Sequence, residues 1–166
     1  MGITWQQQPG VFFTAGYEGV SIAKFLAALR AAGVSTVIDV RRNAVSRKKG
    51  FSKSALRAHL GRVGIGYIHD SRLGAPKAAR ARLQEAGDYD AFFRAYAGSL
   101  DQEHAAFERL LEQLSREICC LMCFESDQER CHRSVLAERV VAVSGGALKA
   151  EHIEWTDQPS GRSSVS

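Results

Sequence analysis

The sequence predicts a single compact α/β domain: a mainly parallel sheet of about four or five strands with helices on both faces. Short apolar segments rich in β-branched residues alternate along the chain with segments whose apolar residues recur at helical spacing. The length of 166 residues is that of one ordinary domain. Hydrophobic residues make up 45% of the chain and charged residues 24%, which excludes a largely disordered or collagen-like protein.

The domain is predicted to begin with a strand at residues 11–14, an apolar run closed by Gly16. A helix with one apolar stripe follows, and we expect Ser21 to cap its start and Gly33 to mark its end. Residues 36–40 are mostly β-branched and predict a buried strand. This order of strand, helix and strand is typical of a parallel βαβ unit.

The middle of the domain is predicted to be mainly helical. A basic loop leads into a helix over about 52–63, and residues 67–68 belong to a third strand. The aromatic residues of 92–96 indicate a short helix, and Asp101 is predicted to cap a longer one. A fourth and most apolar strand over 118–124 follows these helices.

The last elements are a helix predicted over 131–143 and a fifth strand over 148–155. We therefore expect residues 11–155 to form the domain, with an irregular N-terminus (1–10) and a flexible polar tail (156–166).

The sequence also bears on location. Its longest apolar run has seven residues, against the roughly 20 needed to cross a bilayer, so we expect no membrane association. The first ten residues lack the pattern of a signal peptide, which favours a cytoplasmic protein. In that compartment the four cysteines, at 119, 120, 123 and 131, are expected to be reduced thiols.

A strongly basic segment lies within an acidic remainder of the chain. Residues 41–82 hold twelve Lys or Arg residues and one acidic residue, whereas the rest holds ten basic and seventeen acidic residues. This asymmetry favours a polyanionic partner, a nucleic acid or a nucleotide. The alternative is a solvated charged surface with no partner. The residues expected to contact nucleic acid are Arg42, Arg47, Lys48, Lys49 and Lys53.

Polar side chains collect directly after the predicted strands. Parallel α/β sheets bind ligands at the carboxyl ends of their strands, so these side chains define a candidate site. A carboxylate at the end of an apolar strand is costly unless it is paired or in use. The candidates for catalysis are Glu18, Asp39, Glu125, Cys131 and His132, and those for substrate or anion binding are Gly16, Tyr17, Arg41, Ser46, His69 and Arg133.

Structural roles are open alternatives for several of these residues. Asp39 and Arg41 lie two apart on a strand and could pair with each other or with Arg133. Glu125 could cap the following helix. Buried cysteines are most often small apolar core residues, whereas a helix start at Cys131 would favour its thiolate.

Several motifs of defined chemistry are absent from the sequence. It contains no glycine-rich dinucleotide fingerprint, no P-loop and no G-x-S-x-G elbow. Cys123 and Arg130 are one residue too far apart for the loop of cysteine-dependent phosphatases, and the cysteine spacing does not fit a structural zinc site. We therefore expect no cofactor, although Asp39 and Glu125 carry the oxygen ligands that Mg²⁺ takes.

The sequence resembles the domain of unknown function 488 family over about residues 12–140. The segments that carry the resemblance are TAGYE at 14–18, DVRR at 39–42 with Ser46, GYIH at 66–69 followed by LG at 73–74, LMCFE at 121–125 and CHR at 131–133. Family members often have a proline within 43–45 and an alanine at 124, where this chain has Phe124. The resemblance implies a compact α/β domain of bacterial type with one site built from these motifs, and it implies no particular reaction.

The favoured hypothesis is an enzyme that hydrolyses an N-glycosidic or phosphoester bond in a nucleotide or nucleic acid. Its chemistry would need phosphate binding, water activation or stabilisation of developing positive charge, and a proton donor. The expected roles are phosphate binding by Arg41 and Arg133, water activation or charge stabilisation by Glu125 or Asp39, and proton donation by His132 or His69.

Two alternatives are weighed against this hypothesis. In the first, the basic segment makes the protein a non-catalytic nucleic-acid-binding module, and the charged strand ends are a structural network of ion pairs. In the second, the protein is a thiol-dependent enzyme with Cys123 or Cys131 as its nucleophile. The sequence does not predict the oligomeric state.

Overall fold

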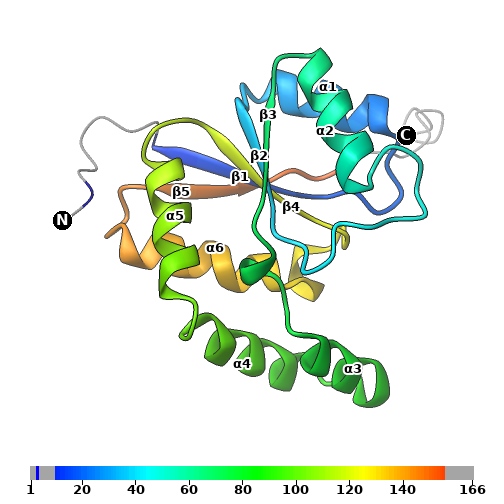
Figure 1. The fold of residues 1–166 in the computed structure, drawn as a ribbon. Helices are drawn as coiled ribbons and strands as arrows, with labels where there is room; N and C mark the ends of the chain where they lie inside the picture. Colours follow the sequence, from blue (N-terminus) through cyan, green and yellow to red (C-terminus); the bar gives the residue numbers. More distant parts are fainter. Residues whose placement is uncertain (1–2, 4–9, 156–166) are drawn as a thin grey trace, which may run out of the picture.

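The computed structural model describes residue 3 and residues 10–155. It confirms the predicted fold class, because five parallel strands form one sheet in the order β3-β2-β4-β1-β5 (Figure 1). The strands are β1 (Val11–Gly16), β2 (Thr36–Asp39), β3 (Gly66–His69), β4 (Cys119–Cys123) and β5 (Lys149–His152). The predicted irregular N-terminus, apart from residues 3 and 10, and the predicted polar tail lie outside the described residues.

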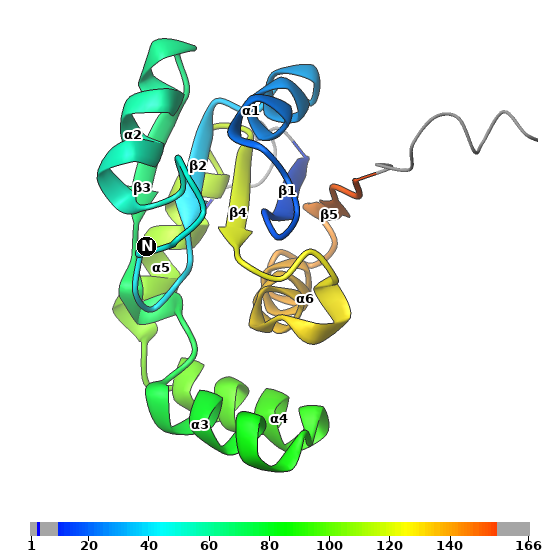
Figure 2. The ribbon, with the colours of Figure 1, turned by 90° about the vertical axis from the view of Figure 1, so that its right-hand side faces the viewer.

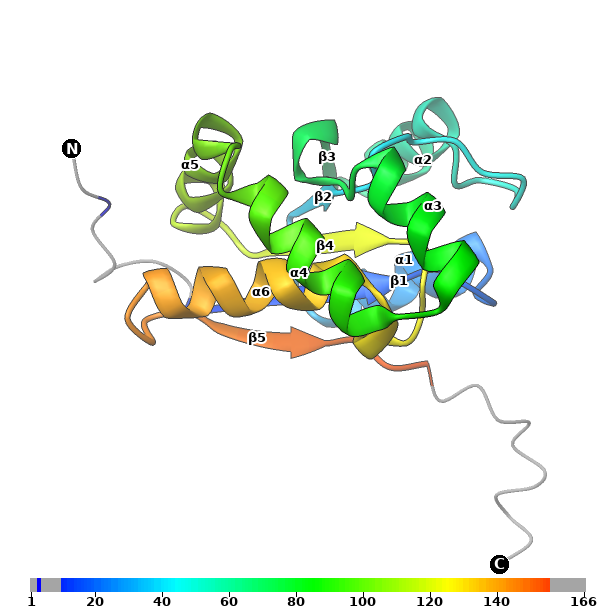
Figure 3. The same cartoon turned by 90° about the horizontal axis from the view of Figure 1, so that it is seen from below.

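Helices cover both faces of the sheet, as Figure 2 shows for α1 and α2 on one side and α6 on the other. The helices are α1 (Ile22–Ala31), α2 (Lys53–Arg62), α3 (Lys77–Ala86), α4 (Tyr89–Leu100), α5 (His104–Leu114) and α6 (His132–Val143). In the view from below, α4 lies across α6 and α3 extends beside α4 (Figure 3). Within the described part of the chain, no helix combines the length and apolar character that a bilayer crossing requires.

The alternation of side chains along β4 explains the two cores. Cys119 and Leu121 pack into the core beneath α5 and α6, whereas Cys120 and Met122 pack into the core beneath α1 and α2. Successive residues of a strand point to opposite faces, and every residue of β4 is buried. A five-residue apolar run is therefore sufficient to place helices on both sides.

Two predicted helix boundaries are confirmed and one is wrong. The Ser21 hydroxyl accepts a hydrogen bond from the backbone N–H of Lys24, and Gly33 follows α1 with a φ of 77°. The prediction that Asp101 caps the start of a helix is wrong, because Asp101 is the C-cap of α4 and Glu103 is the N-cap of α5. The apolar pattern of the sequence did not predict α3, because Ala79 is the only buried residue of this helix and the helix has no wide apolar stripe.

The strand order brings the carboxyl ends of three central strands together. Gly16 at the end of β1 lies opposite Cys123 of β4, and Asp39 at the end of β2 lies opposite Met122. Residues that follow β1, β2 and β4 are therefore neighbours, although the ends of β1 and β4 are more than a hundred positions apart in the sequence.

Candidate functional site

A pocket of about 660 Å³ opens at the carboxyl ends of β1, β2 and β4. Its charged lining consists of six cationic side chains and one carboxylate: Arg41, Arg42, Arg47, Lys48, Arg80, Arg130 and Glu125. Its aromatic and apolar lining includes Phe124, of which 44% is exposed, and Val45, of which 73% is exposed. The pocket is therefore basic, with apolar side chains open to solvent at its wall.

Half of the predicted site residues line this pocket and half do not. The predicted residues in its wall are Tyr17, Arg41, Arg42, Ser46, Arg47, Lys48, Glu125 and His132. The predicted residues outside its wall are Gly16, Glu18, Asp39, Lys49, Lys53, His69, Cys131 and Arg133. Three lining residues were not predicted as part of the site: Phe124, Arg80 and Arg130. Arg80 lies on α3, the helix that the apolar pattern did not predict.

Asp39 and Arg41 form a buried ion pair, which confirms the structural alternative for these two residues. Arg41 donates from Nε and Nη2 to the two carboxylate oxygens of Asp39, at 2.8 and 2.7 Å. Tyr67 donates its hydroxyl to Asp39 at 2.6 Å, and Arg41 Nη1 donates to the hydroxyl of Tyr17 at 3.1 Å. Because Asp39 is fully buried and its carboxylate oxygens accept these hydrogen bonds, it does not line the pocket.

The remaining cations of the pocket have few anionic partners. Arg42, Arg47, Lys48 and Arg80 make no ion pair with a carboxylate among the residues that the structure describes. Arg42 donates from Nη2 to the carbonyl of Gly74 at 2.9 Å, and its buried Nε has no hydrogen-bond partner there. The pocket therefore carries a positive charge that the protein leaves largely unpaired.

Glu125 is the one acidic side chain in the lining of this pocket. Burial raises the pKa of its carboxyl, and this effect exceeds the opposing influence of backbone hydrogen bonding and of the Arg133 charge. A carboxyl with a raised pKa keeps its proton to higher pH and is suited to act as an acid. The alternative role of Glu125 as the cap of α6 is wrong, because Cys131 is the N-cap.

His132 is placed as a neutral imidazole. Its Nε2 atom lies 2.9 Å from the carbonyl of Val40, and its ring packs edge-on against Tyr96. Burial lowers the pKa of His132 to about 4, so the ring is not an imidazolium at neutral pH and is unsuited to act as the acid. His69 hydrogen-bonds the carbonyl of Arg41 and lies outside the pocket wall, which leaves Glu125 as the better-placed acid.

The neutral state of His132 predicts a pH dependence of stability. Between about pH 4 and pH 6.5 the unfolded chain binds a proton at this imidazole that the folded chain excludes. The free energy of unfolding should therefore rise with pH over this interval, by about 3 kcal/mol from this group. Urea titrations of the wild type and of His132→Gln at several pH values would give the slope of the free energy of unfolding against pH. The difference between the two slopes measures the contribution of His132, and equal slopes would contradict it.

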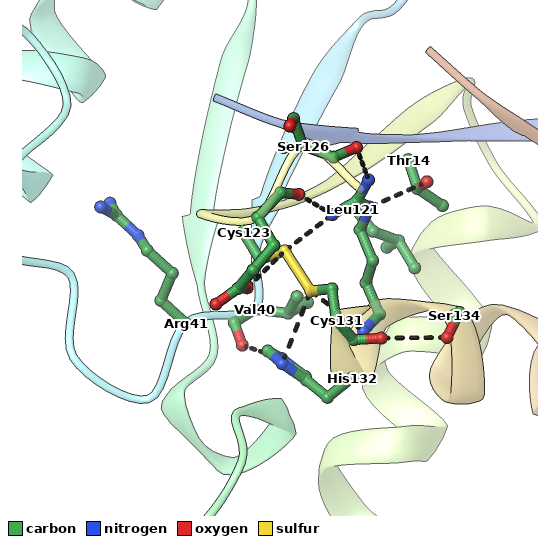
Figure 4. The surroundings of a disulfide bond; sticks show 12 residues. Thr14, Val40, Arg41, Leu121, Cys123, Ser126, Cys131, His132 and Ser134 are labelled. Atoms are coloured by element: carbon green, nitrogen blue, oxygen red, sulfur yellow. Dashed lines mark hydrogen bonds between the residues drawn. A yellow bond between two sulfur atoms is a disulfide. The ribbon is translucent and has the colours of Figure 1, made fainter. Parts of the chain in front are cut away.

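Cys123 and Cys131 meet at the floor of the site. β4 ends at Cys123, Cys131 begins α6, and the two sulfur atoms are joined as a disulfide (Figure 4). Cys119 and Cys120 are free and buried. The expectation of four reduced thiols is therefore wrong for this pair, because the chain between them loops back and sets the helix start beside the strand end.

Arg133 is fully buried and holds this loop in place. It donates from Nε to the hydroxyl of Thr14 at 3.1 Å, from Nη1 to Cys123 Sγ at 3.0 Å and to the carbonyl of Glu125, and from Nη2 to the carbonyl of Ser126 at 3.2 Å. All of its donor atoms are thus occupied by the protein. The structure places Arg133 as a support for the Glu125 loop and outside the wall of the basic pocket.

Glu18 and Gly16 lie on the other side of this loop. The Glu18 carboxylate accepts hydrogen bonds from the backbone and the hydroxyl of Ser126, and it lines a second pocket of about 460 Å³. Gly16 passes directly against the backbone of Glu125, so that a Cβ atom there would overlap it. Both residues support the loop that carries Glu125.

One group of side chains in the described part of the chain has the arrangement of metal ligands: Cys123, Glu125 and Cys131, whose ligand atoms lie within 4.8 Å of one another. Two sulfur atoms joined as a disulfide are not thiolate ligands, so only the reduced pair could bind a metal ion. Asp39, whose carboxylate carries oxygen ligands of the kind that Mg²⁺ takes, is not part of this group.

The fold and the site define the class of protein: an α/β domain with an all-parallel sheet and a basic pocket at the strand ends. The chain matches the family model described as "Domain of unknown function DUF488" over residues 21–140, and it belongs to this family. Comparison with curated proteins and with solved structures gave no match. The match confirms the resemblance and spans α1 to most of α6, including the pocket residues that follow β2 and those of α3 and β4.

Proposed function

We propose that the protein binds a phosphate ester, a nucleotide or a segment of nucleic acid, in the basic pocket and hydrolyses an N-glycosidic or phosphoester bond in it. One observation carries the proposal: Glu125, a carboxyl of raised pKa, shares the pocket lining with cations that lack carboxylate partners. The pocket volume of about 660 Å³ suits a ligand of nucleotide size.

The lining divides into parts that match the parts of a nucleotide. Arg42, Arg47, Lys48 and Arg80 provide positive charge for phosphate. Phe124 is 44% exposed and packs edge-on against Tyr17, with ring centroids 5.4 Å apart, so one face of its ring is available to a base. Stacking of a base on an aromatic side chain contributes about 1–3 kcal/mol.

In the proposed reaction Glu125 donates its proton to the leaving group. For an N-glycosidic bond the leaving group is the base, whose departure leaves positive charge on the sugar, and the resulting carboxylate of Glu125 stabilises that charge. Water then adds to the sugar carbon and gives one proton to the Glu125 carboxylate, which restores the acid and completes the hydrolysis. His132, neutral and hydrogen-bonded to Val40, positions the helix start and does not supply the proton.

Binding is tested by fluorescence anisotropy with labelled single-stranded DNA and RNA over a salt series. We expect micromolar binding that weakens with salt. Replacing Arg47 and Lys48 by glutamine should reduce the slope of log K against log salt by about 1.4, for two lost phosphate contacts. The matched control replaces Lys49 and Lys53, which carry the same charge but lie outside the pocket wall. An equal loss in both double variants would contradict binding in the pocket.

Catalysis is tested with Glu125→Gln, which removes the acid and keeps the shape of the side chain. We expect turnover, measured as release of base or cleavage of the strand, to fall by about 10²–10⁴-fold while binding is retained. Glu129→Gln is the control, because Glu129 is exposed and does not line this pocket. Binding without product from any substrate in wild type would instead favour the non-catalytic binding module.

A further inference from the structure

The disulfide between Cys123 and Cys131 borders the basic pocket. Cys123 is among the pocket's lining residues, whereas Cys131 lies behind it at the start of α6. Both residues are 1% exposed, so the pair borders the pocket only through Cys123. The proposed hydrolysis uses neither sulfur, so the pair is free for chemistry of its own.

Each sulfur has a donor suited to stabilise a thiolate. The guanidinium of Arg133 lies 3.0 Å from Cys123 Sγ, and it forms no ion pair with a carboxylate among the described residues. The backbone N–H of Arg133 donates to Cys131 Sγ at 3.4 Å, and this sulfur lies at the N-terminus of α6. Nearby positive charge and a helix N-terminus both favour the thiolate form of cysteine.

A proton carrier is adjacent to the same pair. Glu125 Oε1 lies 3.8 Å from Cys123 Sγ, in the wall of the pocket. All four cysteines are buried, but Cys119 and Cys120 do not line the pocket, and burial raises the pKa of Cys119 to about 12. Among the four, only the pair of Cys123 and Cys131 combines cationic neighbours, an adjacent carboxyl and, at Cys123, a place in the pocket lining.

We propose that Cys123 and Cys131 form a redox-active pair that exchanges electrons with an anionic low-molecular-weight thiol and its disulfide in the basic pocket. The unpaired cations of the lining, Arg42, Arg47, Lys48 and Arg80, select a negatively charged partner. This activity is separate from the proposed hydrolysis, and its tests measure sulfur chemistry alone.

The exchange balances in two steps. The thiolate of the first small thiol attacks Cys123 Sγ: the bond between the thiol sulfur and Cys123 forms, the Cys123–Cys131 bond breaks, and the electron pair leaves on Cys131 at the start of α6. A second thiolate attacks the small-molecule sulfur of this mixed disulfide and releases Cys123 as a thiolate beside Arg133. Two small thiols are oxidised to one disulfide, the protein pair is reduced by two electrons, and the two protons of the thiols pass to Cys123 and Cys131 or to solvent.

The first experiment uses the unaltered full-length protein. The rate at which its disulfide opens is measured by alkylation and intact mass with reduced glutathione, an anionic thiol, and with cysteamine, a cationic one. We expect glutathione to react on the order of tenfold faster after correction for the reactivity of each thiol with a model disulfide. Replacing Arg47 and Lys48 by glutamine should remove this preference, whereas replacing Lys49 and Lys53 should keep it.

The second experiment traps the intermediate. Reduced Cys131→Ser, mixed with oxidised glutathione, should accumulate a mixed disulfide at Cys123 that peptide mass spectrometry locates, while Cys123→Ser should form none at Cys131 at a comparable rate. Cys119→Ser in the wild-type background is the control and should keep full exchange. The proposal would be overturned if neither small thiol opened the disulfide of the native protein. Equal corrected rates for glutathione and cysteamine would also overturn it, as would four free thiols at every ratio of reduced to oxidised glutathione.

Discussion

Replacing Asp39 by alanine is expected to lower the free energy of unfolding by about 3–5 kcal/mol. The carboxylate is fully buried and receives two charge-assisted hydrogen bonds from Arg41 and a third hydrogen bond from Tyr67. Its removal leaves the Arg41 guanidinium, which is only 6% exposed, without its anion. An unpaired buried charge is among the most destabilising results of a single substitution.

The control for this prediction is Asp101→Ala, which breaks an ion pair at the surface. Arg139 Nη1 lies 2.6 Å from Asp101, but the Asp101 side chain is 62% exposed, so water hydrates the site after its removal. We expect a loss of less than about 1 kcal/mol there. Urea unfolding followed by circular dichroism measures both variants. Similar losses would show that burial does not determine the energetics of the Asp39 pair.

The same pair shapes the pocket, so Asp39→Asn gives information that Asp39→Ala does not. Arg41 also donates to the hydroxyl of Tyr17, and Tyr17 packs against Phe124 and stacks on Phe51 at a centroid distance of 4.4 Å. The amide keeps the shape of the side chain and removes its charge. A folded Asp39→Asn variant with weakened ligand binding would place Asp39 as a positioning residue for the aromatic wall.

The location of the site could be predicted from the sequence, because it follows from a property of the backbone. The carboxyl ends of parallel strands lie at the same edge of the sheet. Once the strands were recognised, Tyr17, Arg41 and Glu125, which follow three of them, could be expected to lie near one another. The apolar and β-branched runs that mark these strands are local signals. The structure added the distances and the volume.

The roles of the charged residues could not be predicted in the same way. Whether Asp39 faces a ligand or Arg41 depends on side-chain rotamers and on Tyr67, which approaches from β3. The burial of Arg133 likewise depends on the loop that folds over it and supplies two carbonyl oxygens. Such contacts join distant segments, and neither periodicity nor composition encodes them.

Gly16→Ala is expected to destabilise the protein by about 3 kcal/mol or more and to abolish function at the pocket. A Cβ atom at Gly16 would overlap the backbone carbonyl of Glu125 and approach the amide of Ser126 too closely. Backbone cannot yield by a change of rotamer, so the loop must move away from β1. That movement would displace Glu125 and strain the hydrogen bonds by which Tyr17 and Glu18 hold the loop.

Gly98→Ala is the matched control, because a Cβ atom there meets nothing within 4 Å and the residue lies inside α4. In a helix interior alanine is preferred to glycine, so we expect this variant to gain about 0.5–1 kcal/mol. A loss of stability in Gly16→Ala and a gain in Gly98→Ala would show that the effect comes from the position and not from the change of glycine to alanine itself. Gly16 would then be required by the close crossing of β1 and the Glu125 loop. If Gly16→Ala keeps wild-type stability and ligand affinity, the loop moves freely over β1, and the position of Glu125 does not depend on this crossing.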